Sequence, residues 1–129
     1  MIPRDDGLKR ARCAGAAFLL AVMSAACSTG ARPPPPEGDA ARGRELLHQY
    51  GCGYCHTIPG VHAARGNIGP PLDDVGRRVY IAGSLPNTPQ QMALWIRFPQ
   101  SYRPGTAMPD LHVRADDARD MVAQLYRLR

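Results

Sequence analysis

The sequence contains little lysine, no internal repeat and no hydrophobic run long enough to cross a bilayer. Its one lysine, Lys9, lies near the start, and from Ser28 onward twelve arginines stand against nine aspartates and glutamates, a formal charge of +3. This modest excess predicts no nucleic-acid partner. The small or apolar stretch 14–26 has thirteen residues, whereas a transmembrane helix needs about 20. With 129 residues and no repeat, the chain holds one domain at most.

Residues 1–27 have the pattern of an export signal, because a basic start precedes the apolar stretch. Two forms of processing fit. The small residues of Ser24-Ala25-Ala26 suit signal peptidase, whereas Ala25-Ala26-Cys27 resembles the end of a bacterial lipoprotein box, with Cys27 as the acylated first residue. That box usually has leucine where this chain has Ser24. We favour the lipoprotein form, because acylation would cap an otherwise odd thiol in an oxidising compartment.

The mature chain is therefore expected on the periplasmic side of the membrane, anchored by lipid or else soluble in the periplasm. Residues 28–38 form a proline-rich linker, in which four consecutive prolines favour a stiff polyproline II spacer. The folded domain is predicted to occupy residues 39–129.

Capping residues and apolar periodicity predict three helices in this domain. The first begins at Asp39, and the second begins at Thr88, with Gln91 completing a capping box. Gly43 lies within the first helix, where glycine costs about 1 kcal/mol relative to alanine and often marks the close approach of another helix. Aspartates near the start of the third helix suit its dipole. The helices should span residues 39–50, 88–98 and 115–126; the third has Asp116, Asp117 and Asp120 in its first turn and buries Ala118, Met121, Val122 and Leu125.

One pentapeptide, Cys52-Gly53-Tyr54-Cys55-His56, carries the chemistry. The pattern C-x-x-C-H attaches a c-type haem: the thiols form thioether bonds with the vinyl groups, and the histidine becomes an iron ligand. A bare C-x-x-C also occurs in thioredoxin-like redox pairs and as half of a zinc site. The redox pair needs a βαβ context, which the sequence lacks, and a closed zinc site needs about four ligands. The remaining histidines are scattered singly, at His48, His62 and His112.

The sequence therefore predicts one covalently attached haem c with His56 as a ligand of its iron. This also accounts for the segment 57–86, which is rich in glycine, proline, aspartate and arginine and shows no strong period. A loop of this length is unusual in a compact domain. It is expected where the chain must wrap a large apolar ring. A second loop is predicted at residues 101–111.

Met108 is the best candidate for the second iron ligand. It lies in the proline- and glycine-rich segment 104–109, which would hold a side chain at a fixed geometry. A thioether is a soft, neutral donor that raises the reduction potential. Met92 and Met121 lie on apolar helix faces, where methionine usually fills the core. His112 is near in sequence but lacks the rigid setting.

With these motifs, residues 39–129 resemble the small class I cytochromes c. The resemblance rests on three motifs: Cys52-x-x-Cys55-His56, Gly69-Pro70-x-Leu72 and Tyr102-x-Pro104-Gly105-Thr106-x-Met108-Pro109. It implies an all-α fold of three to four helices, with long loops wrapped around one covalently attached haem. It also implies that the first and last helices cross, with Gly43 near Leu125 and Tyr126.

The resemblance also implies roles for individual residues. The Pro70 carbonyl would accept the Nδ1–H of His56 and fix its ring. Met108 would be the distal ligand, and Trp95 would pack against the haem and the methionine. Tyr80 and Asn87 are candidate propionate contacts. The chain departs from the family at Arg114, where a capping side chain is usual, and around the haem edge, where lysines are usual and this chain offers only Arg65, Arg97 and Arg103.

Together these features predict a one-electron carrier of a bacterial respiratory chain, and not an enzyme. We expect a monomer that meets redox partners such as a quinol-oxidising complex, a terminal oxidase or a dehydrogenase. Two alternatives stay open. One is a haem enzyme or small-ligand-binding protein with an open distal site, where His112 could act as the polar distal group. The other is a fixed electron-transfer subunit of one dehydrogenase or oxidase.

Overall fold

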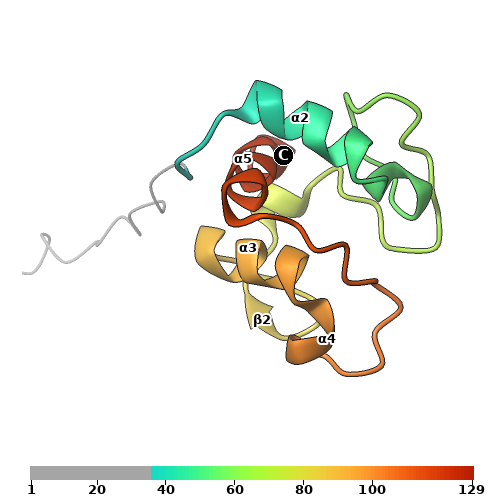
Figure 1. The fold of residues 1–129 in the computed structure, drawn as a ribbon, viewed down its shortest axis with the longest axis vertical. Helices are drawn as coiled ribbons and strands as arrows, with labels where there is room; N and C mark the ends of the chain where they lie inside the picture. The colour runs from blue at the N-terminus through green and yellow to red at the C-terminus, as the bar shows by residue number, and fades with distance from the viewer. Residues whose placement is uncertain (1–35) are drawn as a thin grey trace, which may run out of the picture. The chain divides into compact units, whose positions relative to one another are not determined.

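The structure, a computed structural model, describes residues 36–129. The predicted signal peptide with Cys27, and residues 28–35 of the predicted linker, lie outside the described residues. Of the helices described, none has both the length and the hydropathy needed to cross a membrane. The elements follow in the order α2 (Ala40–Gln49), η2 (Cys52–Tyr54), η3 (Val75–Arg77), β1 (Tyr80–Ile81), β2 (Leu85–Pro86), α3 (Pro89–Arg97), α4 (Pro99–Tyr102) and α5 (Ala115–Leu125) (Figure 1).

The first and last described helices, α2 and α5, pack against each other (Figure 1). As predicted, α2 begins at Asp39, whose carboxylate accepts hydrogen bonds from the N–H groups of Ala41 (2.9 Å) and Arg42 (3.1 Å). Gly43 is buried where the two helices meet, and a Cβ atom there would overlap the Asp120 carbonyl. Glycine is therefore required at this position because the two backbones approach so closely.

The position of this crossing corrects one expectation. The resemblance implied that Gly43 lies near Leu125 and Tyr126, but the structure places it against Asp120 and Met121, about one turn earlier in α5. A hydrogen bond accounts for this position of the crossing. The Asp39 N–H donates to Asp120 Oδ1 at 2.8 Å, so the start of α2 is tied to the middle of α5.

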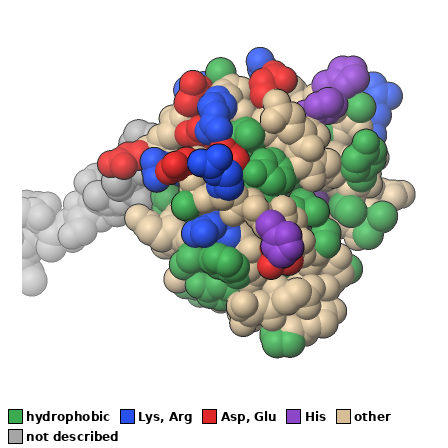
Figure 2. Space-filling model, in the orientation of Figure 1, with side chains coloured by type: hydrophobic (Ala, Val, Ile, Leu, Met, Phe, Trp, Pro, Cys, Tyr) green, Lys and Arg blue, Asp and Glu red, His purple; other side chains and the backbone are tan. Residues whose placement is uncertain are grey.

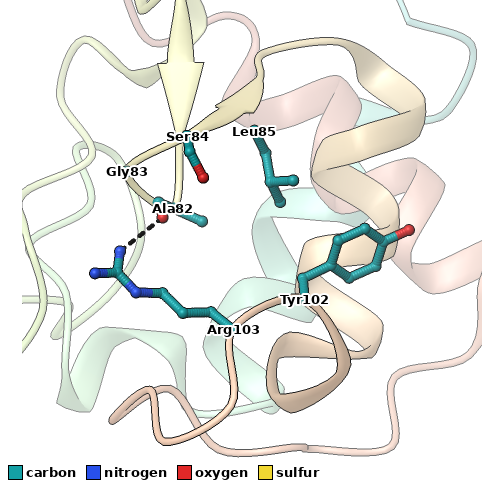
Figure 3. Close-up of a pocket in the computed structure, with 6 residues that line it drawn as sticks. All are labelled: Ala82, Gly83, Ser84, Leu85, Tyr102 and Arg103. Carbon is teal, nitrogen blue, oxygen red and sulfur yellow. Dashed lines mark hydrogen bonds between the residues drawn. The ribbon is translucent and has the colours of Figure 1, made fainter.

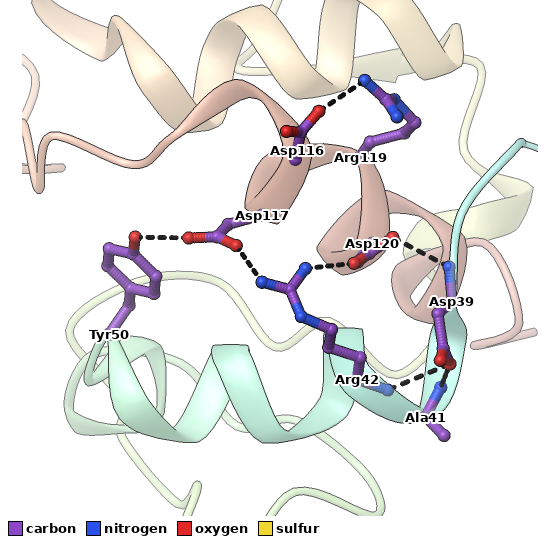
Figure 4. Close-up of polar contacts among 8 residues, drawn as sticks. All are labelled: Asp39, Ala41, Arg42, Tyr50, Asp116, Asp117, Arg119 and Asp120. Atoms are coloured by element: carbon purple, nitrogen blue, oxygen red, sulfur yellow. Dashed lines mark hydrogen bonds and ion pairs between the residues drawn. The ribbon is translucent and has the colours of Figure 1, made fainter.

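A polar cluster along the crossing joins α2 and α5 (Figure 4). The Arg42 guanidinium binds both Asp117 and Asp120, and Tyr50 Oη donates to Asp117 Oδ2 at 2.8 Å. Asp117 is 7% exposed, so its carboxylate is buried but fully paired. The hydrogen bond from Tyr50, followed by that from Arg42, lowers the pKa of Asp117. Asp120 was expected in the first turn of α5, but it lies in the second, where it serves Arg42 and Asp39 rather than the helix dipole.

The predicted stripe of α5 is confirmed: Ala118, Met121, Val122 and Leu125 are all buried. They share one core with Leu46 and Leu47 of α2 and with Met92 and Ile96 of α3. Arg114 provides no side-chain cap at the start of α5, which agrees with the departure from the family seen in the sequence.

The start of α3 was predicted correctly in part. Thr88 is the N-cap, and its Oγ1 accepts the N–H of Gln91 at 3.2 Å. The reciprocal half of the capping box is missing, because the Thr88 N–H already donates to the Pro86 carbonyl at 2.9 Å. The side-chain oxygen of Gln91, Oε1, is consequently buried without a hydrogen-bond partner in the described part of the chain.

Two short elements were not predicted. Residues 57–86 contain the antiparallel pair β1–β2, with Ile81 opposite Leu85, closed by a turn in which Ala82 and Gly83 have positive φ. The predicted helix end at Phe98 is correct, but Pro99 then opens a second short helix, α4, since proline suits the first helical position. The all-α prediction therefore omitted a two-stranded sheet.

Candidate functional site

The cysteine turn follows α2 directly. Gly51 has φ 73°, which ends the helix and lets the chain continue as the 3₁₀ turn η2. The N–H groups of Cys55 (3.3 Å) and His56 (3.0 Å) both donate to the Cys52 carbonyl. The two thiols are not joined to each other by a disulfide, and both are half-buried. One tight turn of backbone thus presents two sulfur atoms and, directly after them, one imidazole.

This geometry suits neither a thioredoxin-like redox pair nor a zinc site. Burial raises the pKa of Cys52 to about 11, and Cys55 adds to this rise. Thioredoxin-like pairs work through a thiol whose pKa is lowered, which is the opposite direction to that of Cys52. A structural zinc site needs about four ligands. Within residues 36–129, no three side chains of His, Cys, Asp or Glu gather where they could hold a metal ion.

The His56 ring is held in one orientation and one tautomer. Its Nδ1 lies 2.7 Å from the Pro70 carbonyl oxygen, which is the contact that the resemblance implied. A carbonyl oxygen only accepts hydrogen bonds, so Nδ1 carries the proton. In a neutral imidazole the lone pair is then on Nε2, which is left available to coordinate iron.

Gly69 forms the surface on which this ring rests. A Cβ atom at Gly69 would overlap the ring of His56, lying 2.7 Å from its Nδ1. The Gly69 N–H donates to the Cys55 carbonyl at 2.8 Å. The Gly69-Pro70 segment is therefore tied to the cysteine turn by two contacts, this backbone hydrogen bond and the one between His56 Nδ1 and the Pro70 carbonyl. Two thiols one turn apart and an imidazole with a free Nε2 fit the requirements of a c-type haem.

The segment after His56 folds back over the cysteine turn. The Gly66 N–H donates to the Gly53 carbonyl at 3.0 Å, and Thr57 Oγ1 donates to the Gly66 carbonyl at 3.0 Å. A Cβ atom at Gly66 would overlap the Tyr54 carbonyl. The ring of Tyr54 itself is 85% exposed. No role was predicted for Gly53 or Gly66 from the sequence. A glycine inside the motif and another shortly after it could have indicated that two stretches of backbone pack closely there.

The four candidates for the second iron ligand differ in how far their side chains are exposed to solvent. Met92 is 2% exposed and Met121 is 0% exposed, and both belong to the core, as expected for methionines on apolar helix faces. Met108 is half-exposed in its loop. His112 points to solvent, has φ 51°, and its Nδ1 lies 3.2 Å from Asp110. Trp95 is half-buried against the core. The roles of Met108 and Trp95 toward a haem stay predictions.

Gln100 was not identified from the sequence, and it is the side chain that holds the Met108 loop. Its Nε2 donates to the carbonyls of Thr106 (2.8 Å) and Met108 (3.1 Å), and its Oε1 accepts the Gly105 N–H at 3.1 Å. The only signal in the sequence was a polar residue between two prolines, Pro99 and Pro104, ahead of a candidate ligand.

Asn87 was a candidate propionate contact, and the structure gives it another task. Its Nδ2 donates to the carbonyls of Val75 and Arg78, both at 2.8 Å. The Tyr126 hydroxyl donates to the Asn87 backbone carbonyl at 2.9 Å, and the Asn87 Oδ1 lies 3.2 Å from the same hydroxyl. Asn87 therefore ties the 75–78 turn to Tyr126, directly after α5, and its role toward a propionate stays a prediction. Tyr80, the other candidate, is 59% exposed.

Two of the three arginines considered for partner docking make internal contacts. Arg97 donates to the Val113 carbonyl (3.2 Å) and stacks on the Phe98 ring at 4.6 Å. Arg103 donates to the Ala82 carbonyl (2.8 Å) across a cavity of about 360 Å³ between the β1–β2 turn and the end of α4 (Figure 3). On the face shown in Figure 2, basic and acidic side chains are interspersed rather than gathered by sign.

No protein-family model matches the chain. A comparison with characterised proteins finds cytochrome c oxidase subunit 2 of Alkalihalophilus pseudofirmus, which is 33% identical over 96 residues. The alignment covers 74% of this chain and 27% of that protein, so the chain matches about a quarter of the relative's length.

This similarity corrects one prediction. From its sequence the chain was expected not to be an enzyme, whereas the relative is by name a subunit of an oxidase and so part of an enzyme complex. The motifs could not have indicated this, because C-x-x-C-H reports how a haem is attached and not which assembly uses it.

Proposed function

We propose that the chain is a haem-carrying electron-transfer domain of a respiratory oxidase, held in one enzyme complex rather than shuttling freely. The observation that carries the proposal is the cysteine turn with His56, whose Nδ1 is bound to Pro70 and whose Nε2 is left free. The similarity to an oxidase subunit supports the choice of complex.

In this proposal each residue of the site has a task. Cys52 and Cys55 bind the haem covalently, and His56 coordinates the iron through Nε2. The Pro70 carbonyl keeps the proton on Nδ1 of His56, and the ring packs against the backbone of Gly69, which has no side chain in the way. A c-type haem bound here would supply a one-electron ferric/ferrous couple. Because the tether is covalent, the redox group could not leave during turnover.

Met108 is proposed as the sixth ligand, with Trp95 packed beside it. The support is that Met92 and Met121 are used up in the core, while the loop of Met108 is fixed by Gln100. With His56 and Met108 both holding the iron, no position would be left for small ligands, which would favour electron transfer.

We also propose the class I cytochrome c fold for residues 39–129. It is supported by the crossing of α2 and α5, by the long loops that carry His56 and Met108, and by the Pro70 contact. The β1–β2 hairpin would be an addition to the all-α plan that the sequence indicated.

The surface near the cysteine turn favours a fixed partner. Tyr54 lies within the turn and is 85% exposed, and Ile68, directly before Gly69, is 73% exposed. Aromatic and aliphatic side chains are typical of the centre of a stable interface, whereas transient redox docking relies more on charge. Arg97 and Arg103 are engaged elsewhere.

The proposal includes export to the periplasmic side of the membrane and an N-terminal anchor at acylated Cys27. Such an anchor would keep the domain beside membrane-bound respiratory enzymes, where it would take electrons from a quinol-oxidising complex and pass them to the oxidase.

The experiment is purification of the tagged full chain from membranes in mild detergent, with a reduced-minus-oxidised spectrum, the mass of the mature protein and identification of co-purifying subunits. We expect a c-type haem spectrum, a mass increased by one haem, and oxidase subunits retained through a high-salt wash. The double variant Cys52→Ala/Cys55→Ala should lose the covalent haem. Recovery of the haem protein alone, in the soluble fraction, would exclude the fixed-subunit proposal.

A further inference from the structure

The loop that carries Met108 has little of its own to hold it in place. Pro104 and Pro109 have no N–H to donate. The loop's own hydrogen bonds are the one from the Thr106 N–H to the Arg103 carbonyl (3.1 Å) and a long one from the Met108 N–H to Thr106 Oγ1 (3.4 Å). Gly105 has φ 79° and nothing within 4 Å of where a Cβ would be. Most residues of the loop are exposed, so burial does not fix its conformation either.

One side chain compensates for this. The Gln100 amide makes three hydrogen bonds to the loop backbone, two as donor to Thr106 and Met108 and one as acceptor from Gly105. A primary amide offers two N–H donors and one carbonyl oxygen, so both ends of this side chain are used. One of these bonds reaches the carbonyl of Met108 itself.

We propose that Gln100 is the positioning residue for Met108: its amide fixes the loop 104–109 so that the thioether is held toward the haem iron. This inference rests on the proposed function, because it assumes that Met108 is a ligand. Pro99, which is buried, anchors the short helix α4 from which Gln100 extends. Arg103, the residue directly after α4, donates to the Ala82 carbonyl and so holds the start of the loop (Figure 3).

The chemistry of the amide matters as well as its size. In Gln100→Glu the carboxylate could still accept the Gly105 N–H, but it would face the carbonyls of Thr106 and Met108 without a proton to donate. In Gln100→Leu all three hydrogen bonds are lost at similar volume. Because Gln100 is exposed, neither change should prevent folding.

The test uses the haem-loaded full chain and three variants: Gln100→Leu, Gln100→Glu and the control Gln90→Leu. Gln90 is exposed on α3 and its side chain makes no hydrogen bond in the described part of the chain. The readouts are the sulfur-to-iron charge-transfer band of the ferric protein and the limiting rate at which added imidazole replaces Met108. A third readout, hydrogen exchange at the Gly105 amide, does not depend on the haem, and urea unfolding reports stability.

We expect the limiting rate of imidazole binding to rise about tenfold or more in Gln100→Leu, since three hydrogen bonds are lost. Gln100→Glu should behave similarly at the iron yet keep more protection at Gly105. Gln90→Leu should match the unmodified protein. If the band is present but the Gln100 variants exchange within twofold of the control, this inference is wrong and the proposed ligation stands. If the unmodified protein lacks the band, Met108 ligation fails and this inference fails with it.

Discussion

Gly69 and His56 show how much can depend on the absence of one side chain. The imidazole lies against the Gly69 backbone, and from that position its Nδ1 reaches the Pro70 carbonyl. Gly69 has a negative φ, so it is not needed for its conformation. It is needed because any Cβ would occupy the space of the ring.

We predict that Gly69→Ala destabilises the fold by about 1–3 kcal/mol, the usual cost of inserting a methyl group into a packed site. The His56 ring must turn or shift, which breaks its hydrogen bond with Pro70. Urea unfolding and the reduction potential of the haem-loaded protein measure the two effects.

Gly60→Ala serves as the control for this prediction. Gly60 has φ 76° and open space around it, so alanine there costs only backbone strain, about 1–2 kcal/mol. It should leave the reduction potential unchanged. An unchanged potential in Gly69→Ala would show that the ring does not depend on this contact.

Asp117 is the second residue on which a sharp prediction can be made. It is buried and accepts hydrogen bonds from both Tyr50 and Arg42, whereas Asp116, its neighbour in α5, is exposed and pairs only with Arg119. Asp117→Asn should cost about 1–3 kcal/mol of unfolding free energy at neutral pH, because one acceptor oxygen becomes an NH2 donor and Arg42 loses the negative charge it pairs with. Asp116→Asn should cost about 0–1 kcal/mol. Equal costs in urea unfolding would contradict a special role for Asp117.

At the scale of elements, the crossing of α2 and α5 is the contact on which the fold depends. Gly43 lies where the helices touch, and the carbonyl of Asp120 occupies the space that a Cβ would need. In an exposed helix, Gly→Ala stabilises by about 1 kcal/mol. Here the sign should reverse.

We predict that Gly43→Ala destabilises the protein by about 1–3 kcal/mol or more, because the helices must separate along their whole contact. Thermal unfolding by circular dichroism measures this. Ala41→Gly, at an exposed position of the same helix, is the matched control and should cost about 1 kcal/mol from propensity alone. A Gly43→Ala variant that is more stable than the unmodified protein would show that the helices adapt freely.

The helices were predictable because their signals are local. Asp39 and Thr88 are N-caps that act on the next three residues, and the buried stripe of α5 follows a helical period. The hairpin β1–β2 was not predictable, because two-residue strands have no period to detect. The short helix α4 was not predicted because Pro99 was interpreted only as the end of α3, whereas it is also the first residue of α4.

The site was predictable where a motif defines it and not where tertiary contacts do. The cysteine turn and the Pro70 contact could be expected from the sequence and the family resemblance. The three hydrogen bonds of Gln100, those of Asn87 and the pairing of Asp117 with Arg42 join residues through folded geometry that no local pattern records. The register of the helix crossing was misjudged for the same reason.

At the scale of the whole molecule, stability should depend on pH at both ends of the range. The pKa of Asp117 is lowered by Tyr50 and Arg42, and that of Asp120 by the Asp39 N–H and then Arg42. A lowered folded-state pKa gives stability that is present above the unfolded value of about 4 and lost as pH falls through the folded values.

The alkaline side has the opposite sign. The hydrogen bond to Asp117 raises the pKa of Tyr50, and burial raises the pKa of Tyr126. Their contribution is present below the unfolded value of about 10 and lost as pH rises through the folded values. We therefore expect these groups to give a plateau of unfolding free energy between about pH 4 and 10. Urea titrations at a series of pH values measure this dependence. In Asp117→Asn the falls in unfolding free energy at acid and at alkaline pH should both be shallower. If both falls are the same in Asp117→Asn as in Asp116→Asn, this assignment is wrong.

The pairing of Arg42 with Asp117 and Asp120 also sets an order of events in time. These partners are separated by more than seventy residues of chain, so the crossing cannot form until α5 has been synthesised. Closing so long a loop is slow compared with forming the local turns within it. The turn with Cys52 and Cys55 lies inside that loop, and Cys52 packs against the core that α5 completes. The Cys52 thiol should therefore be more open to covalent chemistry before the last helix completes the core than after it.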